Sequence, residues 1–199
     1  MNEKDDEGNN RFDISQPEDV IYNGKEQKQP VTIKDTKSGA TLVEGTDYTI
    51  AYSEDVTNAG TVTVTVTGKG NYEGTVSKTY AIKPAELIIT TGTASKEYDG
   101  TPITNSVATV EGVVEADKGQ ITVKATGTQT NAGSSQNTYS IEWGTAKKAN
   151  YTITEKLGTL TITEPYTPPT PPTPPTPPTP PTPDPDPEPE PEPEPTPEP

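Results

Sequence analysis

The side chains that could do chemistry in this 199-residue chain are hydroxyls, carboxylates, lysines and asparagines. Histidine and cysteine are both absent, which removes the commonest general base, the thiol nucleophile and the usual zinc ligands. A serine–lysine or paired-carboxylate mechanism would need a pocket, and no Gly-x-Ser-x-Gly, phosphate-loop or metal-ligand spacing occurs. We therefore expect no enzymatic activity, no cofactor and no catalytic or metal-binding residues.

Two non-catalytic chemistries are left open by the sequence. Lys34, Lys78 and Lys124 lie in strand-like segments, where they are most simply exposed polar residues. The alternative is a covalent bond between one of them and an asparagine, formed with loss of ammonia. Calcium held by carboxylates between domains is a second alternative, although no Asp-x-Asp-x-Asp-Gly loop is present.

Three short motifs occur twice, in the same order. The first set is Tyr22-Asn23-Gly24, Asn58 with Gly60, and Asn71-Tyr72; the second set is Tyr98-Asp99-Gly100, Asn131 with Gly133, and Asn150-Tyr151. Corresponding residues are 76, 73 and 79 positions apart (Tyr22 to Tyr98, Asn58 to Asn131, Tyr72 to Tyr151). Such similar offsets indicate two homologous units. Because glycine and asparagine suit turns, we interpret the motifs as structural turns that enter strands, and not as a binding site used twice.

The segments between the turns alternate with period two, which predicts an all-β fold. In Gly60–Gly68, three valines face one side and four threonines the other, as in a strand of an antiparallel sheet packed on one face. Because only 27% of the chain is hydrophobic, the core must be thin, and the aromatic residues are expected to supply much of its burial. These are Tyr22, Tyr48, Tyr52, Tyr72, Tyr80, Tyr98, Tyr139, Trp143 and Tyr151.

These observations divide the chain into four parts. Residues 1–17 are predicted to be an acidic disordered leader, with an edge strand around residues 11–15 as the alternative. Residues 18–84 and 85–164, here called the first and second repeats, are each predicted to form a small Ig-like β-sandwich. A β-grasp sheet is the alternative, but it requires a covering helix, for which no segment shows the pattern. Residues 165–199 are predicted to be a spacer.

The spacer contains 20 of the 24 prolines, since only Pro17, Pro30, Pro84 and Pro102 precede it. Proline at this density enforces extended polyproline II geometry, and the alternating acidic residues repel one another. An SH3 or WW ligand is the alternative, but the basic residue that such ligands use is missing. With a net charge of −15 the chain should not bind nucleic acid, and no segment is apolar enough to span a bilayer.

Several segments resemble a known family. "YNGKEQKQPVTIKD", "LVEGTDYTIAYSEDVTNAGTVTVTVTGKGNYEGTVSKTYAI" and "KEYDGTPITN" are similar to the MBG/YDG-type bacterial Ig-like repeats, most clearly in the first repeat. The resemblance covers about residues 18–163. It implies tandem modules of a large surface protein of Gram-positive bacteria, and the tail resembles wall-spanning segments that precede a sortase signal.

We therefore expect a non-enzymatic stalk module at the bacterial cell surface or cell wall, and a chain that is a piece of a longer protein. Its expected partners are neighbouring repeats of the same surface protein, and the cell wall through the tail. An adhesin module that recognises host glycan, mucin or matrix protein is the alternative. A third hypothesis is an accessory region that flanks a catalytic domain.

Overall fold

The structure is a computed structural model that describes residues 1, 3, 8 and 10–168. The chain divides into two units, Met1–Pro165 and Tyr166–Pro199, and every described strand lies in the first. Most of the predicted spacer, residues 169–199, lies outside the described residues. Among the described residues the structure is all-β, and helix is limited to two three-residue 3-10 turns. No described helix is long and apolar enough to cross a bilayer.

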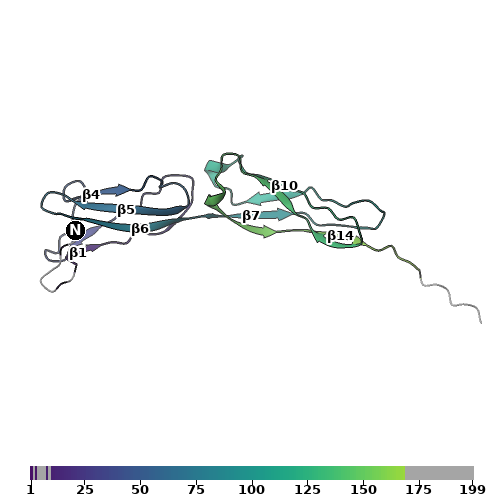
Figure 1. Cartoon of the computed structure of the whole chain (residues 1–199), viewed down its shortest axis with the longest axis horizontal. Coiled ribbons are helices and arrows are strands. Elements are labelled where there is room, and N and C mark those ends of the chain that lie inside the picture. Colours follow the sequence, from purple (N-terminus) through teal and green to yellow (C-terminus); the bar gives the residue numbers. More distant parts are fainter. Residues whose placement is uncertain (2, 4–7, 9, 169–199) are drawn as a thin grey trace, which may run out of the picture. The chain divides into compact units, whose positions relative to one another are not determined.

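The strands of Figure 1 fall before and after Pro84. Before it lie β1 (Phe12–Ile14), β2 (Val20–Ile21), β3 (Ile33–Asp35), β4 (Tyr48–Tyr52), β5 (Gly60–Gly68) and β6 (Thr75–Lys83). After it lie β7 (Ala85–Thr91), β8 (Ala94–Glu97), β9 (Ala108–Glu111), η1 (Glu115–Asp117), β10 (Thr122–Ala125), β11 (Gly133–Gln136), β12 (Tyr139–Glu142), η2 (Lys148–Asn150), β13 (Tyr151–Lys156) and β14 (Thr159–Thr163). Pro84, which has no N–H to donate, is the single residue between β6 and β7.

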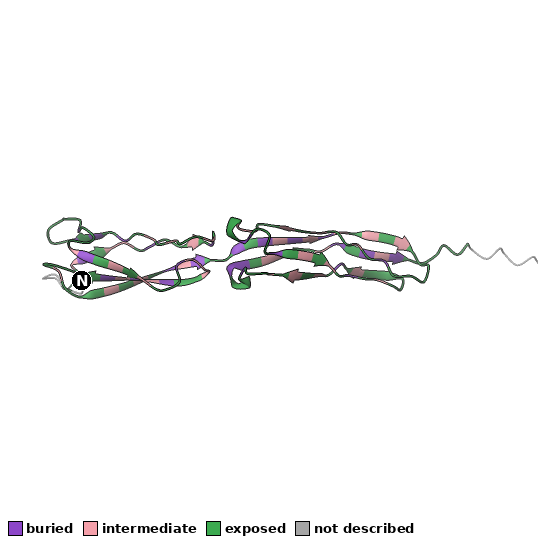
Figure 2. Ribbon diagram, turned by 90° about the horizontal axis from the view of Figure 1, so that it is seen from above, coloured by how far each residue is buried: buried purple, intermediate pink, exposed green. Residues whose placement is uncertain are grey.

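The predicted alternation is visible as alternating burial along the strands (Figure 2). Val62, Val64 and Val66 of β5 are at most 1% exposed, whereas the threonines between them are only partly covered. Leu160 and Ile162 of β14 are buried in the same way. Alternate side chains of a strand point to opposite faces, so the valine–threonine pattern fixes which face of the sheet meets the core.

Strand pairing repeats across the two segments. The antiparallel pair β4–β5 corresponds to β10–β12, and the antiparallel pair β5–β6 corresponds to β11–β14. The single strand β5 is thus matched by two shorter strands, β11 and β12. β2 runs parallel to β6 as β8 runs parallel to β14. The motif glycines hold equivalent positions, since Gly60 lies opposite Ile82 and Gly133 lies opposite Ile162. The sequence duplication is therefore also a duplication of hydrogen-bonded topology.

Two expectations need correction. Residues 12–14 are not part of a disordered leader, because they pair with β3 and Phe12 is 5% exposed; the alternative edge strand is what the structure contains. Lys78 is only half exposed, because it lies on the same face of β6 as Val76 and Tyr80, opposite the buried Val64. The periodicity itself dictates that position. Lys34 and Lys124 are exposed, as expected.

One buried polar residue holds the loops of the second repeat together. Asn137 is 0% exposed, and its side chain donates to the carbonyl oxygens of Gly92 and Asn105 at 2.9 Å each. Its Oδ1 accepts from the Gly127 amide at 3.2 Å. An unpaired buried polar group costs about 1–3 kcal/mol, so this side chain satisfies three groups that the fold would otherwise leave unpaired.

We predict that Asn137→Ala lowers the free energy of unfolding of the second repeat by about 3 kcal/mol, because it unpairs those buried groups. The chain has a single tryptophan, Trp143, so its fluorescence in a urea titration reports on this repeat alone. Asn131→Ala, at an exposed position, is the matched control and should leave the midpoint nearly unchanged. Equal midpoints for the two variants would contradict the role given to Asn137.

Candidate functional site

Two of the recurring motifs of the chain meet at a buried carboxylate. Tyr22 of the first repeat donates its hydroxyl to Asp117 Oδ2 at 3.0 Å, and Tyr151 of the second repeat donates to the same oxygen at 2.7 Å. Asp117 ends the turn η1 and is 8% exposed. The rings of Tyr22 and Tyr151 contact each other edge to face, with centroids 5.7 Å apart. The two repeats are thus joined through shared hydrogen bonds to one acceptor.

Burial decides the electrostatics of this cluster. A carboxylate removed from water needs hydrogen-bond donors, and the two hydroxyls supply them. The pKa of Tyr151 is raised by burial and by its bond to Asp117, and the pKa of Tyr22 is raised for the same two reasons. Both tyrosines therefore stay neutral donors well above neutral pH. Trp143, with its ring centroid 5.9 Å from that of Tyr151, covers the other side of the cluster.

A second polar contact joins the Asn58 motif to the same Asn150-Tyr151 motif. Asn150 is 1% exposed, and its Nδ2 donates to Asn58 Oδ1 at 2.9 Å while its Oδ1 accepts from the Ala59 amide at 2.8 Å. Asn58 is held for this contact by Asp55, which accepts from its backbone and side-chain N–H groups. Those bonds lower the pKa of Asp55 to about 2, so this carboxylate stays charged. The pairing of two amides gives the contact directional specificity.

Gly24 completes the joint because a side chain would not fit there. Its φ is +77°, and a Cβ would lie 2.4 Å from the Cβ of Ala116, in the turn that carries Asp117. Asn23 shapes the preceding turn, since its Oδ1 accepts from the Lys25 amide. The Tyr-Asn-Gly motif thus does two jobs: the tyrosine reaches the carboxylate and the glycine lets the two backbones approach. We call Tyr22, Gly24 and Asn58 with Asp117, Asn150 and Tyr151 the polar joint.

The corresponding motifs of the second repeat are arranged alike but are uncovered. The Tyr98 amide donates to the carbonyl of Thr163 at 2.9 Å, as that of Tyr22 donates to Lys83 at 2.8 Å. Asp99 shapes the turn by accepting from the Thr101 amide, as Asn23 does for Lys25. Yet Tyr98 is 44% exposed, so the prediction that it belongs to the core is wrong. The core prediction depended on the small number of apolar residues available, whereas burial of this tyrosine requires a neighbouring repeat.

The other predicted turn residues lie at the ends of strands. Gly60 and Gly133, the first residues of β5 and β11, have φ values of +158° and +132°; the second requires glycine most clearly. Asn131, two residues before β11, is exposed. Asn71 is exposed too, and Tyr72 is half-buried with its ring edge to face against Phe12 at 5.7 Å. Each motif occurs twice, and only one copy of each contributes to the polar joint. The Tyr-Asn-Gly motif and the Asn58 motif come from the first repeat, and the Asn-Tyr motif comes from the second.

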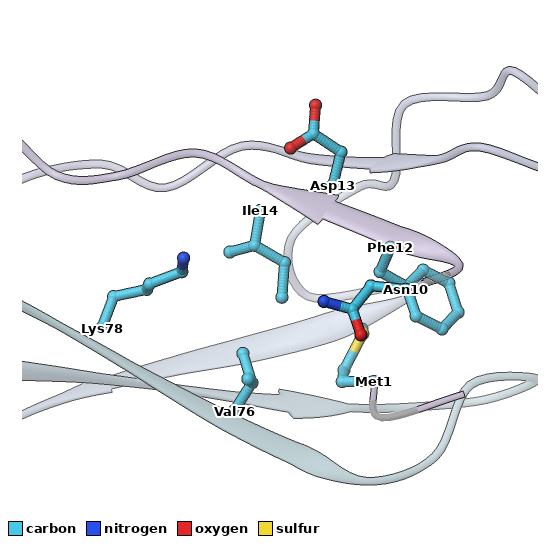
Figure 3. Close-up of a pocket in the computed structure, with 7 residues that line it drawn as sticks. All are labelled: Met1, Asn10, Phe12, Asp13, Ile14, Val76 and Lys78. Carbon is cyan, nitrogen blue, oxygen red and sulfur yellow. The ribbon is translucent and has the colours of Figure 1, made fainter. Parts of the chain in front are cut away.

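A cavity of about 320 Å³ near β1 and β6 is lined by a lysine, an asparagine and an aspartate among other residues (Figure 3). The Lys78 side chain points toward Ile14, and Ile14 and Val76 stand between its amine and Asn10 (Figure 3). The Asp13 carboxylate points away from both, because Asp13 lies between the inward-facing Phe12 and Ile14. The amine, amide and carboxylate of a lysine–asparagine cross-link are therefore not assembled here. Among the described residues, no group of three or more acidic side chains is placed to hold a metal ion.

Asp117 is the member of the polar joint that sequence reasoning missed. It stands in "GVVEADKG", between two glycines, where a lone acidic residue is indistinguishable from solvated charge. Two features of the sequence could have indicated that Asp117 is buried. Val113 and Val114 precede it, and tyrosines far away in the sequence need a hydrogen-bond acceptor. The recurring motifs were found because their sequences match, whereas the turns that carry Asp47 and Asp117 differ in length by one residue, so the carboxylate is not part of a matching motif.

Comparison with known proteins assigns part of the chain to a family. Residues 81–158 match the YDG domain. The match covers the end of β6 and most of the second repeat up to the residue before β14, whereas the resemblance in the sequence is clearest in the first repeat. A search of the curated proteins finds no match to this chain.

We predict that Gly24→Ala destabilises the protein more than Gly100→Ala does. Both glycines have a left-handed φ, +77° and +81°, so each change costs about 1–2 kcal/mol of backbone strain. Only at Gly24 does the new methyl group meet a neighbour, which adds about 1–3 kcal/mol of overpacking. Urea unfolding followed by far-UV circular dichroism measures the difference. Equal losses would show that Ala116 does not press on Gly24 in solution.

We predict that the polar joint weakens in alkali. The raised pKa values of Tyr22 and Tyr151 mean that their stabilising effect is complete below the unfolded value near 10 and is lost as the pH rises above it. Tyr22→Phe should lower the free energy of unfolding at neutral pH by about 1.5–3 kcal/mol, the usual value for a hydrogen bond to a charged group. It should also flatten the decline between about pH 9 and 11.

The matched control for that experiment is Tyr166→Phe, since Tyr166 is 79% exposed. Its pH profile of stability should coincide with that of the parent chain. A Tyr22→Phe profile as steep as the parent's would show that the Tyr22 hydroxyl is not buried against Asp117.

Proposed function

We propose that this chain is a non-enzymatic structural module of a bacterial cell-surface protein, in which two small Ig-like sandwiches and a proline-rich spacer hold a distal region away from the cell wall. The polar joint is the observation that carries the proposal. A binding domain needs polar and aromatic side chains on a free surface. Here the tyrosine, aspartate and asparagine side chains of the polar joint form hydrogen bonds between the two repeats instead.

The chemistry of the joint fits a load-bearing role. One residue, Pro84, separates β6 from β7, so the backbone between the repeats has little freedom. The tyrosine–carboxylate bonds and the paired amides are directional, and they resist rotation about that short connection better than apolar contact alone would. The absence of cysteine from the chain means that this resistance does not depend on disulfides.

The resemblance to tandem surface repeats and the YDG match over residues 81–158 support an extracellular, wall-associated setting. The adhesin alternative depended on exposed tyrosines. Tyr22, Tyr48, Tyr80 and Tyr151 are instead at most 7% exposed, which leaves Tyr98 and Tyr166 as the exposed ones among the described tyrosines. A surface with so few aromatic platforms favours spacing over sugar recognition.

The proposal predicts a stiff joint. Spin labels placed at the exposed Lys34 and Lys124, after substitution of both by cysteine, should give one narrow distance distribution in pulsed dipolar spectroscopy. Asn58→Ala should broaden it because Asn150 loses its partner, whereas Asn131→Ala, at the equivalent uncovered position, should not. A distribution that is broad in the parent chain would contradict a stalk role.

A glycan and matrix-protein array distinguishes the adhesin alternative. Under the stalk proposal the chain shows no reproducible binding on the array. Reproducible binding that disappears in Tyr98→Ala, with the fold intact by circular dichroism, would replace the stalk proposal with a recognition function.

A further inference from the structure

One end of the second repeat carries residues equivalent to those that the first repeat contributes to the polar joint. We call Tyr98, Gly100 and Asn131 the free donor face, by analogy with Tyr22, Gly24 and Asn58. No described residue accepts a hydrogen bond from the Tyr98 hydroxyl, and a Cβ at Gly100 would meet nothing within 4 Å. The backbone that displays these residues is held as in the first repeat, with Tyr98 bonded to Thr163 and Gly133 opposite Ile162.

The first repeat, in turn, presents the opposite side of the joint. Asp47 immediately precedes β4, whereas Asp117 lies five residues before β10. The Asp47 amide donates to the Val43 carbonyl as that of Asp117 donates to Val114, and Asp47 Oδ2 accepts from the Val43 amide at 2.8 Å. Asn71-Tyr72 precedes β6 as Asn150-Tyr151 precedes and begins β13. Asn71 is exposed, and Val43 is 59% exposed where Val114 is half-buried. We call Asp47, Asn71 and Tyr72 the free acceptor face.

We propose that the free donor face of one chain binds the free acceptor face of a second copy, so that the chains associate head to tail. Tyr98 takes the place of Tyr22 and donates its hydroxyl to Asp47 of the second copy. Asn131 pairs with Asn71 as Asn58 pairs with Asn150, and Gly100 allows Thr46 to approach as Gly24 allows Ala116. The polar joint is the template, so the occupant is specified residue by residue.

Two physical properties of the association can be derived from this arrangement. A heterologous contact of this kind does not close on itself, so it extends into linear oligomers and not into a closed dimer. The contact is small and is not tethered between copies, so it lacks the effective concentration that the short connection at Pro84 provides within one chain, and association should increase with protein concentration. Because the chain carries a net charge of −15, added salt should strengthen the association by screening repulsion between copies.

The chain has no cysteine, so introduced thiols give a clean test. Asn131→Cys chains mixed with Asn71→Cys chains under mild oxidation should form disulfide-linked heterodimers several-fold faster than Asn131→Cys chains mixed with Lys124→Cys chains. Lys124 is exposed on β10 and belongs to neither face. The rate of the first mixture should rise between low salt and about 0.5 M NaCl, where the Debye length falls to a few ångströms.

A second substitution distinguishes loss of the proposed contact from loss of the fold. Tyr98→Phe in the Asn131→Cys chain removes only the hydroxyl that Asp47 would accept, and it should lower the heterodimer rate about tenfold while the circular dichroism spectrum stays the same. Heterodimers at the control rate, Asn131→Cys homodimers at the same rate, or no effect of Tyr98→Phe would each overturn the proposal. None of these outcomes bears on stiffness within one chain, so this test is independent of the stalk role.

Discussion

The hydrogen bonds that Asp117 accepts from Tyr22 and Tyr151 fix the two repeats against each other. They come from residues 95 and 34 positions away in sequence, so one carboxylate ties the first repeat to two elements of the second. A carboxylate that is 8% exposed is tolerable only with both donors in place, because an unpaired buried charge costs several kcal/mol. Each repeat alone would therefore leave this acceptor or these donors unsatisfied.

That dependence links the thin cores to the joint. Each repeat relies on valine, isoleucine and tyrosine drawn from a chain that is 27% hydrophobic, so neither can form an extensive apolar interface and keep its own core. Polar contacts solve this problem because they need few atoms and specific geometry. Tyrosine suits the task, since its ring buries apolar area while its hydroxyl reaches a polar partner.

Sequence reasoning could predict the parts of the fold that depend on local pattern. The valine–threonine alternation placed Val62, Val64 and Val66 on the buried face, and the repeated motifs marked turns whose pairing recurs. It could not predict that Tyr98 is exposed and Asp117 is buried, because the burial of both residues depends on contacts between repeats. A tyrosine at a turn has the same sequence signature whether a neighbour covers it or not, and an aspartate in a polar turn has the same signature whether it is buried or solvated. The partial burial of Lys78 could have been predicted, because the alternation that places Val76 and Tyr80 on the inner face places Lys78 there too.

The duplicated motifs therefore have meaning at two levels. Within a repeat, Gly60 and Gly133 begin equivalent strands, and Asn23 and Asp99 shape equivalent turns. Between repeats, the same short segments carry the tyrosine, glycine and asparagine that the next unit recognises. A change that preserves the turn can still destroy the recognition, as an alanine at Gly24 would by meeting Ala116. The short segments that shape the turns of a repeat are therefore also those that join it to another repeat.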